Sequence, residues 1–139
     1  MADGIPSKIH LVVVTRERKI VETDVDEVVL PGLDGELGVL PGHTPLLAML
    51  KIGQMRYRNG NTMERLVISW GFAEVLPDRV IVMAETARLP QEIDAAAAEQ
   101  QRREAEKEIA DLSSHDPEFA LAEARLEESV AMINLSREM

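Results

Sequence analysis

Residues 31–47 read PGLDGELGVLPGHTPLL and contain four glycines and three prolines. Glycine adopts positive backbone torsions, whereas proline fixes one torsion and removes a hydrogen-bond donor, so the stretch suits neither a long helix nor a central strand. We expect tight turns joined by two short extended pieces, GELGV and PLLAML. Its polar residues are Asp34, Glu36, His43 and Thr44. A stretch this apolar and this conformationally defined must pack inside the fold or on a partner.

The size and composition of the chain restrict what it can be. With 139 residues it is one domain, or a small domain with an appendage. The absence of cysteine excludes disulfides, thiol catalysis and cysteine-based zinc sites. The longest aliphatic run, residues 11–14, is far short of the roughly 18–20 residues of a membrane span, and no signal-peptide pattern is present, so we expect a soluble protein. The net charge of −10 disfavours nonspecific nucleic-acid binding.

The chain changes character near Pro90. Residues 1–90 hold ten Lys/Arg and twelve Asp/Glu, whereas residues 91–139 hold five and thirteen, which gives net charges of −2 and −8. All eight glycines lie at or before Gly71. We therefore expect two units, residues 1–89 and residues 90–139.

Residues 1–89 have the pattern of short antiparallel strands. Residues 8–15 are rich in β-branched residues, and within 19–30 Val21, Thr23 and Val25 alternate with acidic residues. Turn residues recur every ~8–12 positions along this part of the chain. Asn59-Gly60 is a hairpin signal, for which we expect a type I′ turn between strands 54–58 and 63–70. Residues 72–76 and 79–85 are two further strands. The pattern favours an antiparallel β-sandwich or barrel.

Residues 90–139 have helical periodicity. From Pro90 a helix of about 20 residues is expected, with an alanine-rich face; its members are Ile93, Ala97, Ala105, Ile109 and Leu112. Asp116 is a good N-cap and Pro117 suits the first position of a second helix, which should end near Ser136. Its predicted stripe is Phe119, Ala122, Leu126, Val130 and Ile133. The fold class is thus α+β, an N-terminal antiparallel β-sandwich followed by a C-terminal antiparallel two-helix hairpin.

Catalytic and metal-binding patterns are missing from the sequence. GELGVLPG lacks the Lys-Ser/Thr ending of a phosphate-binding loop, and no Gly-x-Ser-x-Gly element occurs. The three histidines, His10, His43 and His115, fall in different expected elements, so no metal site is predicted. We expect no cofactor, and a binding or regulatory protein.

The sequence resembles one family across its whole length, the epsilon subunits of F-type ATP synthases from bacteria and chloroplasts. The residues that carry the resemblance are the gapless string GELGVLPGHTPLL at 35–47, with Val25-Asp26-Glu27-Val28, Glu74-Val75-Leu76-Pro77-Asp78-Arg79-Val80 and Ala84-Glu85-Thr86-Ala87. The change from strands to helices at Pro90 matches the family's architecture independently.

The resemblance implies a non-catalytic rotor subunit of the central stalk, on the cytoplasmic face of the bacterial plasma membrane, that meets the membrane only through the complex. The sandwich would grip the gamma subunit and rest on the c-ring, and so couple ring rotation to the catalytic head. The contact residues implied are Gly35, Glu36, Gly38, Pro41, Gly42 and His43. The hairpin would be regulatory, because in bacterial relatives it extends into the alpha/beta head and blocks ATP hydrolysis.

Two departures from the family pattern matter. Some relatives bind ATP through an Ile/Leu-Asp-x-x-Arg-Ala motif, which here reads Ile93-Asp94-Ala95-Ala96-Ala97-Ala98, so Ala97 replaces the arginine. Because phosphates need cationic donors, we predict no ATP binding. The hairpin is also acidic where inhibitory relatives are basic, which predicts weak inhibition or inhibition that depends on gamma.

Three points stay open at this stage. Relatives often carry a second glycine in the segment that here reads Ser69-Trp70-Gly71. Trp70 is interpreted as core, with an exposed anchor on a partner as the alternative. The chain could instead be a stand-alone adaptor that binds a partner outside the synthase. A third reading is a small hydrolase that uses His43 with Glu36.

Overall fold

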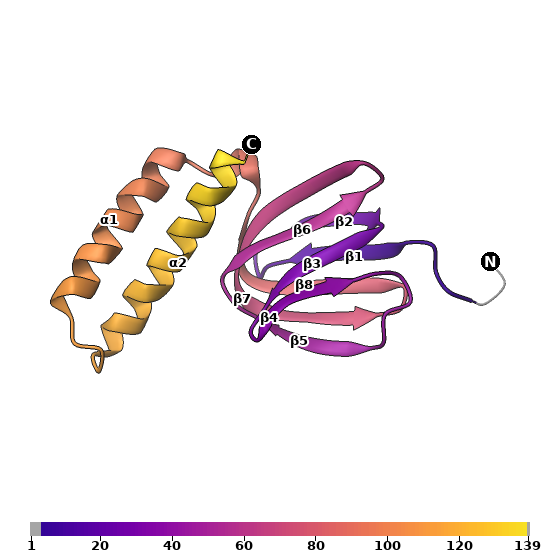
Figure 1. Ribbon diagram of the computed structural model, residues 1–139, viewed down its shortest axis with the longest axis horizontal. Helices are drawn as coiled ribbons and strands as arrows, with labels where there is room; N and C mark the ends of the chain where they lie inside the picture. The colour runs from indigo at the N-terminus through magenta and orange to yellow at the C-terminus, as the bar shows by residue number, and fades with distance from the viewer. Residues whose placement is uncertain (1–3, 139) are drawn as a thin grey trace.

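The computed structural model describes residues 4–138, which form eight strands, one short 3₁₀ helix and two α-helices (Figure 1). The strands form a sandwich at one end of the elongated molecule, and the helices form a hairpin at the other. The strands are β1 (Ile9–Val14), β2 (Lys19–Val25), β3 (Glu27–Gly32), β4 (Gly35–Val39), β5 (Leu46–Leu50), β6 (Gly53–Asn59), β7 (Thr62–Leu76) and β8 (Arg79–Arg88). The helices are η1 (Pro90–Glu92), α1 (Ala95–Asp111) and α2 (Pro117–Arg137). The expected α+β class, a sandwich followed by a helical hairpin, is confirmed.

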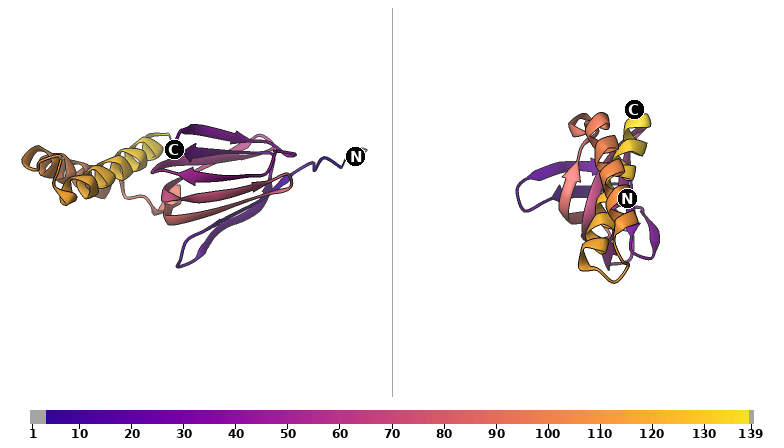
Figure 2. Two further views of the ribbon diagram at one scale, coloured as in Figure 1. Left: turned by 90° about the horizontal axis from the view of Figure 1, so that it is seen from below. Right: turned by 90° about the vertical axis from the view of Figure 1, so that its left-hand side faces the viewer.

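The strands form one hydrogen-bonded sheet that folds over into two layers (Figure 2). The order is β2-β1-β8-β7-β5-β3-β4, and β6 bridges β3 and β7. Every strand pair is antiparallel except β1 with β8, which is parallel. An antiparallel sandwich was predicted, and this one pair differs from the prediction. The reason is that β8 returns from the β7 hairpin to lie beside the first strand of the chain.

Within residues 4–138 the sandwich core has eighteen buried residues, all of them aliphatic except Met55, and the half-buried Tyr57 packs against it. In β1 the inward residues Ile9, Leu11 and Val13 are fully buried, while the intervening residues are half-exposed. Alternate residues of β1 therefore face the core, as the pleat of a strand requires.

Strand β7 is one strand of fifteen residues where two separate strands were expected. Its inward residues are Leu66 and Ile68 before Trp70 but Ala73 and Val75 after it, so the alternation shifts by one residue in between. Trp70 has φ +49° and Gly71 has φ +148°. At this corner β7 passes from one layer of the sandwich to the other, as strands that serve two sheets do at a local bend. We call Ser69, Trp70 and Gly71 the corner.

The corner requires glycine at position 71. A Cβ atom there would lie 2.1 Å from the carbonyl oxygen of Met83 on β8. The β7 and β8 backbones can approach this closely only because Gly71 has no side chain.

The hairpin between β6 and β7 is confirmed, but its turn is displaced by one residue. Asn59 pairs with Thr62, so Gly60 and Asn61 are the central residues. Gly60 has φ +63°, and among the described residues Trp70 is the only non-glycine with positive φ. Glycine at the first central position followed by a residue of negative φ fits a type II′ turn rather than the expected type I′.

Helix α1 begins at Ala95, five residues later than expected. Residues Pro90–Glu92 form a single 3₁₀ turn, Ile93 is extended, and the Asp94 side chain accepts a hydrogen bond from the Ala97 N–H at 3.1 Å. The helical phase therefore starts at this N-cap. Ala98 and Ala105 are buried in the hairpin, while Ala97, predicted on the apolar face, is exposed.

Helix α2 begins where it was predicted, with Asp116 as N-cap and Pro117 in the first turn. It is buried on two sides, because it packs against α1 and against β6 and β7. Its buried residues are Ala122, Ser129, Met132, Ile133 and Leu135. Val130, predicted on a single buried stripe, is 38% exposed.

The hairpin contacts the sandwich through a second, smaller apolar cluster. Val67 of β7 is 1% exposed and packs with Met132 and Leu135 of α2. Beside this cluster the Ser69 hydroxyl donates to a Glu128 carboxylate oxygen at 2.8 Å, and Arg65 Nε lies 3.6 Å from a Glu138 carboxylate oxygen. Few residues hold the hairpin in place, and they differ from those of the sandwich core.

Candidate functional site

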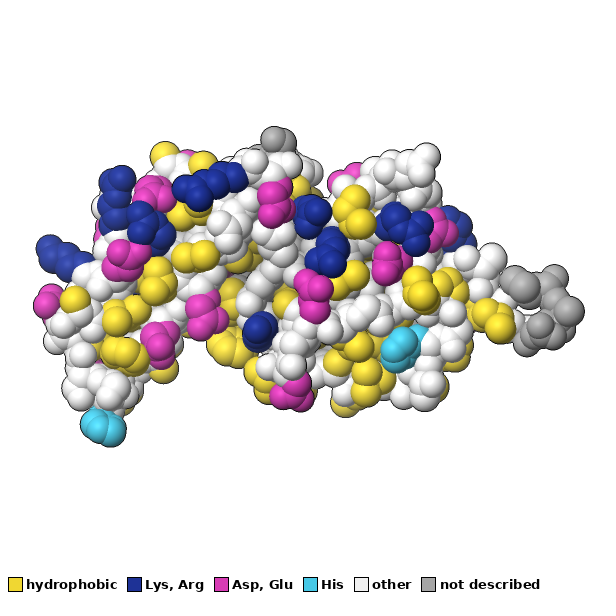
Figure 3. Space-filling view, in the orientation of Figure 1, with side chains coloured by type: hydrophobic (Ala, Val, Ile, Leu, Met, Phe, Trp, Pro, Cys, Tyr) yellow, Lys and Arg dark blue, Asp and Glu magenta, His cyan; other side chains and the backbone are white. Residues whose placement is uncertain are grey.

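Exposed hydrophobic side chains are concentrated on one part of the sandwich. Six of the twelve large hydrophobic residues exposed in the described chain lie around β5 and the neighbouring parts of β3, β7 and β8. We call these six residues the apolar face; they are Leu33, Leu46, Leu47, Met49, Phe72 and Met83. Figure 3 shows hydrophobic side chains along the side of the sandwich where Figure 1 places β4 and β5.

Strand register makes the apolar face continuous. Met49 pairs with Phe72, which in turn pairs with Met83, so the three side chains form a row across β5, β7 and β8. The Leu33 N–H donates to the Met49 carbonyl at 2.9 Å, which places the β3–β4 turn beside this row. Between them lies a hollow of about 460 Å³ whose lining includes Leu33, Leu46, Leu47 and Met49. Contiguous exposed apolar surface of this kind marks a site of protein interaction.

An ion pair stands at one edge of the hollow. Arg56 of β6 donates from Nη1 and Nη2 to the two Glu36 carboxylate oxygens, at 3.0 and 3.4 Å. This hydrogen bond, with the positive charge of the guanidinium, holds the pKa of Glu36 below its ordinary value. Glu36 is thus an exposed, fixed negative charge beside apolar surface, which is suited to orienting a partner.

The loop between β4 and β5 is fixed by its own hydrogen bonds. The Gly42 N–H donates to the Pro77 carbonyl at 2.8 Å, and Gly42 has φ +87°. His43 Nδ1 donates to the Thr44 carbonyl oxygen at 2.7 Å. The loop therefore presents His43, which is half-buried, in a defined orientation.

The six contact residues predicted from the sequence lie along β4 and its two ends. Gly35 and Glu36 follow the β3–β4 turn, Gly38 lies mid-strand opposite Val29, and Pro41, Gly42 and His43 are in the loop beyond. Glu36 and Val39 are three strand positions apart, about 10 Å, and His43 is farther along the chain. Because Glu36 and His43 have different hydrogen-bond partners, the acid–base pair required by the hydrolase reading is not formed.

Sequence reasoning missed Met49, Phe72 and Met83, and it assigned Trp70 to the core. Trp70 is 42% exposed and belongs to neither apolar cluster, so the core interpretation was wrong. A signal was available for Phe72, because it alternates with Ala73 and Val75 and shares its parity with the charged Glu74. That alternation indicates an outward side chain.

One histidine, His10 of β1, lies beside two carboxylates of β2, the strand at one edge of the sheet. His10 bonds Asp24 through Nδ1 and Glu22 through Nε2, both at 2.8 Å. The two carboxylates raise the pKa of His10 above its ordinary value. Because they flank opposite sides of the ring, they cannot share a metal ion with it, and no group of three or more potential ligands within residues 4–138 is placed to hold one.

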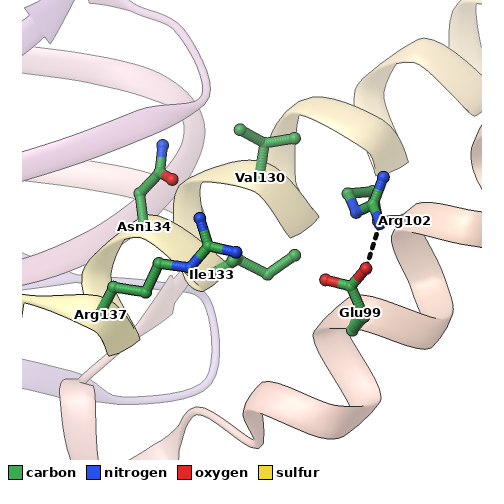
Figure 4. Close-up of a pocket in the computed structure, with 6 residues that line it drawn as sticks. All are labelled: Glu99, Arg102, Val130, Ile133, Asn134 and Arg137. Carbon is green, nitrogen blue, oxygen red and sulfur yellow. Dashed lines mark hydrogen bonds and ion pairs between the residues drawn. The ribbon is translucent and has the colours of Figure 1, made fainter.

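The degenerate nucleotide motif lies at the start of α1. Ile93 is half-buried against the second cluster, Asp94 caps the helix, and Ala98 is buried. A cavity of about 240 Å³ lies between the helices (Figure 4) and is lined by Glu99, Arg102, Val130, Ile133, Asn134 and Arg137. Arg102 is engaged by Glu99 and Glu106. The cavity is smaller than usual ligand sites, and one of its two cations is already paired.

Comparison with known proteins assigns the chain to a family. Residues 8–90 match the family described as ATP synthase, delta/epsilon chain, beta-sandwich domain, and the chain belongs to this family. An ATP synthase epsilon chain of Syntrophobacter fumaroxidans is 43% identical over 129 residues, covering 93% of this chain and 96% of the relative. That of Halalkalibacterium halodurans is 38% identical over 128 residues, covering 92% and 96%.

A solved structure agrees with this assignment. A chain in the Euglena gracilis mitochondrial ATP synthase structure, described as OSCP/F1/c-ring, superposes with a TM-score of 0.81 at 26% identity, over 95% of this chain and 83% of that one. The chain is accordingly a non-catalytic central-stalk subunit of an ATP synthase, a membrane-associated complex. The adaptor and hydrolase readings are set aside. Within residues 4–138 no helix is both long and apolar enough to cross a membrane.

Proposed function

We propose that the chain transmits rotation from the ion-driven c-ring to the catalytic head, with the gamma subunit bound on the apolar face. The observation that supports this is an exposed apolar surface on a chain of the ATP synthase delta/epsilon family. The hairpin packs on β6 and the first half of β7 and leaves this surface uncovered. A subunit that works only within a complex needs such a surface, and burying it drives assembly.

Further contacts of this assembly are assigned to residues of β4 and of the loop that follows it. Glu36 with Gly35 and Gly38 lies at one edge of the apolar face, and Pro41, Gly42 and His43 lie in the loop at the far end of the strand. We assign these six residues to contact with the c-ring and gamma. Because Glu36 is already paired with Arg56, a partner cation would share or replace that ion pair.

The two parts of the chain are proposed to divide the work. Residues 1–89 form the sandwich that binds gamma and the c-ring, and residues 90–139 form a regulatory hairpin. In the structure the hairpin is docked on the sandwich. Because the hairpin is acidic, we propose that, when it extends toward the alpha/beta head, it inhibits ATP hydrolysis weakly or through contacts with gamma. We propose that the complex lies on the cytoplasmic face of the bacterial plasma membrane.

Binding to gamma tests the main proposal. Met49→Asp and Leu47→Asp each put a charge on the apolar face and should weaken the affinity for gamma by tenfold or more, because a desolvated unpaired charge is costly. The matched control is Met63→Asp, a substitution on β7 at a residue that is 41% exposed but outside the apolar face. Equal affinity of all variants would contradict the proposal.

Hydrolysis by the assembled head tests the regulatory half. The rate is measured with the full chain and with a chain truncated after Pro90. A several-fold rise on truncation means that the hairpin inhibits despite its charge. Equal rates, with gamma binding retained, would restrict the function to residues 1–89.

A further inference from the structure

The backbone at Trp70 has a left-handed torsion, which is strained for a tryptophan. Left-handed torsions are tolerated by glycine and by asparagine or aspartate, but for a bulky residue they are a genuine outlier. Trp70 has φ +49° and is the only described non-glycine residue with positive φ. Residues held in such regions persist where the surrounding structure fixes them, and they cluster at functional sites.

The residues on either side of Trp70 fix its backbone. Ser69 is 5% exposed and is held by the hydrogen bond to Glu128. Gly71 is confined by Met83, whose carbonyl oxygen leaves no room for a side chain. Position 70 must therefore adopt the left-handed conformation whatever residue occupies it.

The side chain of Trp70 nevertheless remains substantially exposed. Trp70 is 42% exposed and packs in neither the sandwich core nor the cluster beneath the hairpin. A tryptophan of this exposure offers a large rigid apolar surface with one N–H donor, which is the side chain most enriched at the centres of protein interfaces.

The location of Trp70 connects it to the apolar face. It precedes Phe72 by two residues on β7, and Phe72 pairs with both Met49 and Met83. By register, Trp70 lies opposite Glu85 of β8, between the Ser69–Thr86 and Gly71–Ala84 pairs. Its other neighbour on β7, Ser69, bonds the hairpin. Trp70 thus stands between the apolar face and the base of the hairpin.

We propose that Trp70 is a contact residue for the gamma subunit and extends the apolar face around the corner to the base of the hairpin. This inference rests on the proposed function, which supplies gamma as the occupant of that face. It adds one contact residue to the apolar face, and it places gamma next to the hydrogen bond by which Ser69 holds the hairpin.

Substitution separates strain from contact. Trp70→Gly and Trp70→Asn both fit the left-handed backbone, so the thermal midpoint of the isolated chain should stay equal or rise. Affinity for purified gamma should nevertheless fall about tenfold, because the indole is lost. The control Met63→Ala, at an exposed residue of the same strand, should leave affinity unchanged. Wild-type affinity for both Trp70 variants would overturn the proposal, and a large loss of thermal stability in both would overturn the strain argument beneath it.

A measurement on the unsubstituted chain gives an independent test. Trp70 is the only tryptophan, so labelling with 5-fluorotryptophan yields one ¹⁹F signal. Addition of unlabelled gamma should shift or broaden that NMR signal and should reduce its relaxation by a soluble paramagnetic agent. If gamma binds and the signal is unchanged, the Trp70 inference fails alone. If wild-type chain and gamma do not associate, the proposed function fails with it.

Discussion

Replacing Val67 with aspartate should release the hairpin while the sandwich stays folded. Val67 is 1% exposed and lies among Met132 and Leu135 of α2, whereas its neighbours Leu66 and Ile68 point into the sandwich core. The side chain at position 67 therefore contributes to the docking of the hairpin and not to the packing between the two layers.

The magnitude follows from what the side chain buries. Val67→Ala removes two carbon groups, each contributing about 0.8 kcal/mol, so docking weakens by about 1.6 kcal/mol or roughly 15-fold. Val67→Asp also forces a carboxylate against apolar surface, which costs several kcal/mol more. A change from 99% docked to 1% docked takes about 5.5 kcal/mol. We therefore expect partial release with alanine and nearly complete release with aspartate.

Fluorescence energy transfer measures the release directly. Because the chain has no cysteine, one dye pair can be attached at Met63→Cys on β7 and Leu121→Cys on α2, both exposed positions. Transfer should fall in the order wild type, Val67→Ala, Val67→Asp, with the circular dichroism of the strands unchanged. Met83→Asp, exposed on the other layer, is the matched control and should keep the wild-type transfer.

Two results would refute this reasoning. Unchanged transfer in Val67→Asp would mean that the second cluster does not hold the hairpin. Cooperative loss of the sandwich in the same variant would mean that hairpin and sandwich form one folding unit, contrary to their separate clusters.

Three further predictions concern other parts of the chain. Asp24→Asn should lower the pKa of His10 in an NMR titration, since Asp24 is the main cause of its elevation. Because the pKa of His10 is raised in the folded state, its interactions with Asp24 and Glu22 stabilise the fold fully below about pH 6.5, and this stabilisation is lost as pH rises through the folded pKa. The difference in unfolding free energy between wild type and variant should therefore narrow at alkaline pH. An unchanged pKa of His10 in Asp24→Asn would contradict the role given to Asp24. Gly71→Ala should destabilise the chain by about 3 kcal/mol or more in urea unfolding, because the added Cβ would lie 2.1 Å from the Met83 carbonyl oxygen. Gly38→Ala is the control, because a Cβ at position 38 meets no atom within 4 Å. Calorimetry with millimolar ATP should detect no binding, because Ala97 replaces an arginine and Arg102 is paired; clear saturable heat would refute this.

The elements that sequence reasoning located well are those set by local chemistry. The β-branched run over residues 8–15 predicted the first strand, and Asp116-Pro117 predicted the start of α2. In both cases the relevant interactions span only a few residues, either along a strand or within the first turn of a helix.

The errors arose where distant segments decide the conformation. Trp70 was interpreted as core, with an exposed anchor on a partner as the alternative, and the passage of β7 between layers beside Met83 leaves it exposed. In the first turn of α1 the buried alanine is Ala98 rather than Ala97, because the 3₁₀ turn at Pro90–Glu92 delays the start of the helix, whereas Ala105 is buried as predicted. The apolar face was missed because its row forms only when β5, β7 and β8 are aligned.

The separation of the two apolar surfaces has a mechanical consequence. The hairpin rests on the outer side of one layer, at Val67, while the row from Met49 to Met83 lies on the outer side of the other. Because the two surfaces share no side chain, a partner can stay on the apolar face while the hairpin docks or leaves. The only described point where the surfaces approach each other along one strand is the corner, where Ser69 bonds the hairpin and Phe72 begins the apolar row. The proposed regulatory role of the hairpin needs this arrangement, because the sandwich must keep its partner whether or not the hairpin is docked.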